Sequence, residues 1–201
     1  MTVGYYHILY AEPPVGGSLK PASGFVGIGG SGFGRWGERV LIGGGGFGTV
    51  DRMVLAEGVE VQTGFGMGFF DFGYVLRDKG RNLIFGFAGI GGGGSDLTYG
   101  NTGVAPVAVQ NVGVLAPGER AKVNSGGLGW ELGLSLNRLL FDPEKSGGGF
   151  SAGLDLGMAM LPAASRWKRE TAGGETPVGQ DGRPMQTVFY VRMTIGGGMF
   201  R

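Results

Sequence analysis

Two stretches of this sequence alternate strictly between large apolar residues and glycine or small polar residues. In the run from Gly127 to Leu140, the even positions from 128 to 136 hold leucine or tryptophan, whereas the odd positions from 127 to 137 hold glycine, serine, asparagine and one glutamate. The run from Gly149 to Met160 repeats the pattern. A period of two residues predicts β-strands and excludes helices. The strand face formed by the glycine and small polar residues has small side chains and few charges. Such a face suits a narrow enclosed interior better than contact with water.

Composition narrows the class of protein further. The chain has 201 residues and 47 glycines, but no glycine at every third position, so it is not collagen. A net charge of +1 with 16% charged residues gives no electrostatic reason to expect nucleic acid as a partner. The absence of cysteine excludes disulfides, cysteine-bound zinc and thiol chemistry. We expect one all-β domain over residues 1–201, since no linker divides the chain.

The order of short and long connections predicts the topology. Eight strands are expected, at 2–10, 24–33, 39–49, 60–76, 82–95, 127–140, 149–161 and 186–200. Short turns at 34–38, 77–81 and 142–147 alternate with longer segments at 11–23, 50–59, 96–126 and 162–185. If all short turns lie at one end, the four longer loops lie at the other. This is the plan of an antiparallel up-and-down β-barrel.

These alternating strands and connections, with a closing strand at 187–195, resemble the small outer-membrane β-barrels as a class. The resemblance covers nearly the whole chain. It implies an outer-membrane location, the lipid bilayer as a partner, and a structural or surface-interaction role through the longer loops. Barrels of this class commonly end in an aromatic residue, whereas here Phe200 is followed by Arg201.

Two other readings of the sequence stay open. Glycine leaves both faces of 27–32 and 43–46 nearly bare, which fits a soluble or extracellular protein that self-assembles into an oligomer or filament. A small pore or transport protein is the other alternative. No run approaches the roughly 20 apolar residues of a spanning helix. The segment 1–6 lacks the features of a secretion signal, so we expect either no export from this start or a mature sequence to which Met1 was added.

Two groups of residues are candidate sites. The interior face is expected to carry Glu131, Asp155 and Arg192, and an arginine between two carboxylates would neutralise most of their charge. We interpret these three as a structural network, with an ion or proton path as the alternative. The last long loop contains the cluster Arg166, Trp167, Lys168 and Arg169, for which we expect a role in surface interactions.

Enzymatic and cofactor chemistry find little support in the sequence. His7 is the sole histidine, so one chain cannot form a multi-histidine metal site, and it is expected at an interface or in the lumen. Three Gly-x-Gly-x-x-Gly matches, beginning at Gly27, Gly43 and Gly89, introduce no helix and arise readily by chance in a glycine-rich chain. We therefore predict no catalytic residues, no metal and no cofactor.

Overall fold

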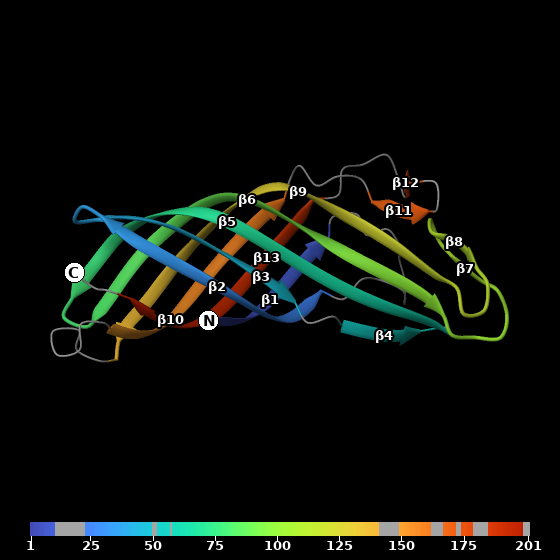
Figure 1. Cartoon of the computed structure of the whole chain (residues 1–201), viewed down its shortest axis with the longest axis horizontal. Helices are drawn as coiled ribbons and strands as arrows, with labels where there is room; N and C mark the ends of the chain where they lie inside the picture. Colours follow the sequence, from blue (N-terminus) through green and yellow to red (C-terminus); the bar gives the residue numbers. More distant parts are fainter. Residues whose placement is uncertain are drawn as a thin grey trace.

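Eight antiparallel strands close into a ring in the computed structural model (Figure 1). The model describes residues 1–10, 23–49, 52–56, 58–140, 149–161, 167–171, 174–178 and 185–198. In spatial order the ring consists of β1 (Thr2–Tyr10), β2 (Gly24–Trp36), β3 (Val40–Thr49), β5 (Val59–Lys79), β6 (Asn82–Asn101), β9 (Arg120–Leu139), β10 (Gly149–Leu161) and β13 (Gln186–Gly198). The predicted barrel and its eight strands are confirmed. Within the described ranges, no helix is long and apolar enough to cross a membrane.

The first and last strands complete the ring. β1 pairs with β13 along its whole length, from Thr2 opposite Thr194 to Tyr10 opposite Gln186, so neither strand has a free edge there. The turns from β2 to β3 and from β5 to β6 are tight, and Gly37 and Gly80 supply their positive φ angles of 69° and 61°. The predicted turn at 142–147 lies outside the described residues. β1 begins and β13 ends at the end of the barrel that carries these turns (Figure 1).

Three strands continue well beyond the rest of the ring. β5, β6 and β9 have 21, 20 and 20 residues. Their parts farthest from the short turns, which we call their upper parts, form a projecting sheet at the right of Figure 1. The sheet is widened by β4 (Arg52–Ala56), β11 (Lys168–Thr171) and β12 (Gly174–Pro177). The hairpin of β7 (Val107–Val109) and β8 (Gly113–Leu115) lies nearby.

The prediction of a loop over 96–126 is therefore wrong at both of its ends. β6 runs to Asn101 and β9 begins at Arg120, and the two strands stay paired up to Gly100 and Arg120. The physical reason is that the two-residue alternation continues there. Leu97 of β6 is buried. In β9, Ala121 and Val123 are buried, whereas Lys122 between them faces water.

The interior of the barrel is filled by fitting large side chains against glycines. Aromatic side chains point inward from most strands of the barrel, among them Tyr6, Phe25, Phe47, Phe65, Phe69, Phe85, Phe87 and Tyr190. β9 and β10 offer glycines opposite these rings. A Cβ added at Gly133 would strike the Phe87 ring, and one at Gly157 would strike the Tyr190 ring. The small face seen in the sequence thus points inward and makes room for the aromatic face of neighbouring strands.

The outer wall of the barrel is apolar. The exposed side chains include Phe70, Phe72, Ile90, Leu128, Leu132, Leu156, Val191 and Met193. Leu128, for example, is 74% exposed. The apolar faces of β9 and β10 therefore point away from the barrel axis, as lipid contact requires, and not into a soluble core. An eight-stranded antiparallel barrel with such a wall has the architecture of an outer-membrane protein. We therefore place the chain in an outer membrane.

Outward-facing glycines form one band on this wall. Gly30 pairs with Gly46, Gly46 with Gly68, and Gly68 with Gly92, so the band crosses β2, β3, β5 and β6. A Cβ added at Gly30 would meet no atom within 4 Å. The glycine-dense first half of the sequence therefore leaves the backbone uncovered on the outside of the barrel.

Candidate functional site

A group of charged and hydroxyl side chains is buried in the lumen. Arg192 Nε lies 3.5 Å from Asp155 Oδ2, and both side chains are almost fully enclosed. Ser135 Oγ donates a 2.5 Å hydrogen bond to Asp155 Oδ1. Glu131 accepts a 2.8 Å hydrogen bond from the hydroxyl of Tyr190. The three predicted residues are thus buried in the same interior, with Arg192 paired directly to Asp155 and Glu131 held by Tyr190.

Two members of this group were not anticipated from the sequence. The Arg192 guanidinium lies 4.3 Å from the centre of the Tyr190 ring, so Tyr190 contacts the arginine with its face and Glu131 with its hydroxyl. Asp71 is buried in β5, where its carboxyl group interacts electrostatically with that of Glu131. Gly89 stands between their strands, and a Cβ there would strike Asp71 Oδ1. Asp71 shares the inward face with Phe69, two residues before it, but large apolar residues on both faces of β5 conceal this in the sequence.

The projecting sheet has a core of its own, separate from the barrel interior. It is formed by Val59, Val61, Leu97, Tyr99, Val109, Val112, Leu115, Ala121, Val123 and Trp167. The residues come from the upper parts of β5, β6 and β9, from the β7–β8 hairpin and from the segment leading into β11. Because these side chains pack on one another, the three long strands stay extended beyond the lipid-facing wall.

The cluster predicted in the last long loop divides into different environments. Trp167 is only 3% exposed and belongs to the upper core. Arg169 Nη1 donates a 2.6 Å hydrogen bond to the carbonyl of Val112 and so ties β11 to the β7–β8 hairpin. Lys168 has an accessible side chain, paired with Glu175 at 2.7 Å. Arg166 lies outside the described residues.

Carboxylates accompany the basic groups of the projecting sheet. Lys122 Nζ lies 3.3 Å from Glu170 and 3.6 Å from Asp96. The hydrogen bond to Glu170, followed by the charge of Asp96, raises the pKa of the Lys122 ammonium group above its usual value. This surface therefore carries many charged groups but little net charge.

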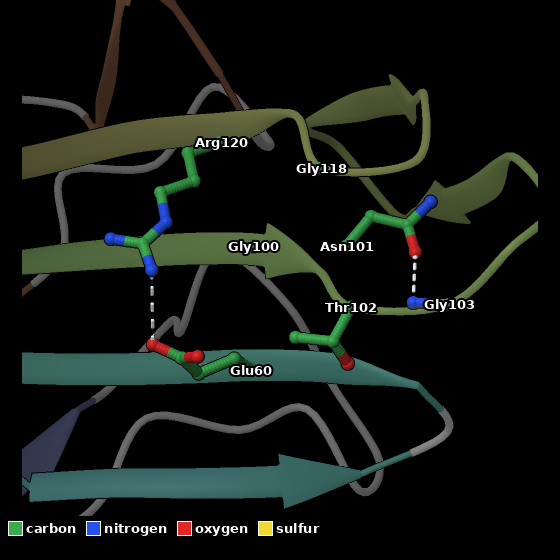
Figure 2. Close-up of a pocket in the computed structure, with 7 residues that line it drawn as sticks. All are labelled: Glu60, Gly100, Asn101, Thr102, Gly103, Gly118 and Arg120. Carbon is green, nitrogen blue, oxygen red and sulfur yellow. Dashed lines mark hydrogen bonds and ion pairs between the residues drawn. The ribbon is translucent and has the colours of Figure 1, made fainter.

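A pocket of about 290 Å3 opens on the outer face of the projecting sheet. Figure 2 shows the residues that line it. Glu60 of β5 and Arg120 of β9 flank Gly100 of β6, and the Arg120 Nη2 to Glu60 Oε1 distance is 3.7 Å. The lining is completed by Asn101, Thr102, Gly103 and Gly118. Because Gly100 carries no side chain, the opposed charges face each other across bare backbone.

The pocket is held in shape by Asn101. Its side-chain amide donates hydrogen bonds of 2.8 and 2.9 Å to the carbonyls of Ala105 and Leu115. Its side-chain oxygen accepts a 2.9 Å hydrogen bond from the backbone N–H of Gly103 (Figure 2). Asn101 is buried, so these bonds fix the chain where it leaves β6. The pocket therefore rests on a braced loop.

In the part of the chain that the structure describes, no group of three or more histidine, cysteine, aspartate or glutamate residues is placed to hold a metal ion. His7 lies in β1, opposite Phe189 of β13 and Gly24 of β2. Tyr5 and Leu9, two residues to either side of it, are exposed on the outer wall. Its place is thus on the outside of the barrel and not in the lumen.

Comparison with known proteins yields a relationship of fold. No protein-family model matches the chain, and no curated protein matches it. Among solved structures, it is similar to the crystal structure of Ail, the attachment invasion locus protein of Yersinia pestis. The TM-score is 0.51, the sequence identity is 8%, and the match covers 98% of this chain and 95% of that one. The two chains therefore share an architecture over nearly their whole lengths.

Proposed function

We propose that this chain is a non-enzymatic outer-membrane barrel that presents its projecting sheet at the cell surface for interaction with a partner. The observation that carries the proposal is the second core, formed by residues such as Val61, Val123 and Trp167, which lies beyond the lipid-facing wall. A barrel that only had to span the bilayer would not need it. Its presence supports a role for the structure that it holds up.

The orientation of the barrel supports exposure of this sheet. In outer-membrane barrels the short turns face the periplasm and the longer connections face outward. The projecting sheet lies at the end opposite the turns that contain Gly37 and Gly80. The name of Ail, an attachment protein, fits a surface role for this architecture.

Within the projecting sheet, the pocket is the proposed contact point. The Glu60–Arg120 pair is loose at 3.7 Å, and the Arg120 side chain is mostly exposed. A partially exposed pair of this kind contributes little to stability, so its groups are available to a partner's charges. The exposed ammonium group of Lys168, also in this sheet, is a second candidate contact.

We propose a structural role for the lumen network of Glu131, Asp155 and Arg192. The supporting observations are the direct ion pair, the Tyr190 hydrogen bond and the packed rings around them. Breaking a buried network by removing one partner is costly. A pore is less well supported, because large side chains fill the interior. We also propose residues 1–201 as one domain, since β5 and β6 contribute side chains to both cores.

The functional proposal is tested by exchanging the charges of the pocket. Cells that display the chain are compared with cells displaying the double variant E60R/R120E, which keeps opposite charges side by side, for adherence to cultured animal cells. We expect the natural chain to confer adherence and the exchange to lower it about tenfold, a change of 1.4 kcal/mol in binding. The matched control is R35D/D78R, which exchanges the exposed 2.7 Å ion pair at the opposite end of the barrel.

Two results would count against the proposal. The first is adherence no greater with the natural chain than with an empty membrane. The second is an equal loss of adherence in both exchanged variants, because the short-turn end should not meet the partner. The amount of folded barrel in the outer-membrane fraction is measured in parallel for each variant by heat-modifiable migration.

A further inference from the structure

Basic residues gather at the short-turn end of the barrel, where few acids accompany them. The described residues at this end include six basic side chains, Arg35, Arg39, Arg77, Lys79, Arg81 and Arg138, and two acidic ones, Glu38 and Asp78. All eight residues are exposed. The connection 141–148 lies outside the described residues, and its sequence adds two acids and one base, which leaves the sign positive.

The two ends of the molecule differ in how their basic groups are paired. In the projecting sheet, Arg120, Lys122, Lys168 and Arg169 each lie within 3.8 Å of a carboxylate. At the short-turn end, Arg35 pairs with Asp78. Arg77, Lys79, Arg81 and Arg138, which we call the basic rim, make no ion pair with another described residue. The rim therefore carries charge that the described residues do not neutralise.

The basic rim lies at the border of the lipid-facing wall. Arg77 is opposite Ile84, and Ile84 is opposite the outward-facing Leu136. Arg138 and Lys79 both pair with Asn82, so they follow one row closer to the turn.

Aromatic side chains mark the same border. Trp36 and Tyr74 lie on one outward row through Val40, and both are at least half exposed. Tyrosine and tryptophan prefer the level of the lipid headgroups. The rim is thus placed at the depth of the phosphates and not beyond the membrane surface.

We propose that the basic rim binds anionic phospholipid headgroups in the leaflet that faces the short turns. Its position beside the apolar wall favours a lipid over a soluble acidic partner, because headgroup phosphates lie at that depth. Arginine suits such contacts, since its guanidinium group can bind phosphate through two parallel hydrogen bonds. This proposal rests on the membrane placement, but it does not depend on the pocket or on adherence.

The test is lipid selectivity in bilayers. The full chain is reconstituted in phosphatidylcholine vesicles, and electron paramagnetic resonance compares spin-labelled phosphatidylglycerol with spin-labelled phosphatidylcholine at the protein boundary. We expect about a two- to fivefold preference for phosphatidylglycerol at low salt, which weakens as salt screens the charges. The double variant R77Q/R138Q should bring the ratio close to one, whereas R77K/R138K should keep most of the preference.

The matched control is K122Q/K168Q, which also removes two positive charges but takes them from groups paired with carboxylates. It should retain the preference. Equal selectivity in the natural chain and R77Q/R138Q would overturn the proposal, as would an equal loss in the control. Flotation with the vesicles is checked first. A chain that does not float contradicts the membrane placement, whereas a floating chain without a lipid preference contradicts the basic rim alone.

Discussion

Gly157 of β10 lies directly beneath the ring of Tyr190 of β13, its partner in the strand register. An added Cβ would strike the hydroxyl and the ring carbon that bears it, and would come within 2.7 Å of Cε2. The absence of a side chain at Gly157 is thus what allows Tyr190 to reach Glu131. This contact links the glycine pattern of the sequence to the buried charges of the barrel.

We predict that G157A destabilises the barrel by about 1–3 kcal/mol, the usual cost of overpacking. The tyrosine ring must move, and its hydrogen bond to Glu131 must lengthen. Urea unfolding in lipid vesicles measures the change. G30A is the matched control, because its added methyl group would meet no atom within 4 Å, and its stability should stay within about 0.5 kcal/mol of the natural chain. Equal effects of both substitutions would contradict this packing.

Removing the Tyr190 hydroxyl is predicted to leave Glu131 with one hydrogen bond fewer inside the barrel. Y190F should therefore cost about 1–3 kcal/mol, since a buried acceptor loses its donor. The same unfolding experiment measures it, with Y74F as the control because Tyr74 is exposed on the outer wall. If Y190F unfolds at the same urea concentration as the natural chain, the hydrogen bond does not support the fold.

Trp167 is predicted to hold up the projecting sheet without supporting the barrel below it. W167A removes a large side chain from the upper core and should cost that core about 3–5 kcal/mol. Limited proteolysis should then cleave within the upper parts of β6 and β9, while the barrel keeps its heat-modifiable migration. W36A, at the exposed rim, should leave the cleavage pattern unchanged. Loss of the folded barrel in W167A would show that the two cores are not separable.

The packed interior predicts that the barrel does not conduct ions. Phe47, Phe65 and Phe87 are among the buried rings that occupy the lumen, and an eight-stranded barrel is just wide enough for its side chains to fill. Planar-bilayer recordings of the refolded protein should show no unitary current steps. Regular steps of constant size would restore the pore among the candidate functions.

The barrel could be predicted from the sequence because β9 and β10 alternate cleanly and glycine marks the tight turns. The upper strands were missed for a different reason. After Ser95 in β6 and before Ser125 in β9, the outward positions hold Asp96, Asn124 and other polar residues, as in an ordinary water-facing sheet. With glycine and proline close by, this change of outer face predicts a loop, although Leu97 and Val123 keep the period of two.

The candidate sites were less predictable, because tertiary contacts decide them. Glu131 and Asp155 stand out as charges on a face of small residues. Asp71 does not, because large apolar residues occupy both faces of β5 around it: Phe69 points into the lumen and Phe70 to the outside. Trp167 lies in a polar cluster and gave no local sign of burial. Its contacts come from strands about 45 to 110 residues earlier in the chain.

The account depends most on which end of the barrel faces the outside of the cell, and site-directed labelling measures this directly. The chain has no cysteine, so single cysteines are introduced as V104C, at a fully exposed position beyond β6, and E38C, in the turn between β2 and β3. A membrane-impermeant maleimide should label V104C on intact cells, and E38C only after the outer membrane is permeabilised. Labelling of E38C but not V104C on intact cells, or recovery of the chain in the soluble fraction, would contradict the account.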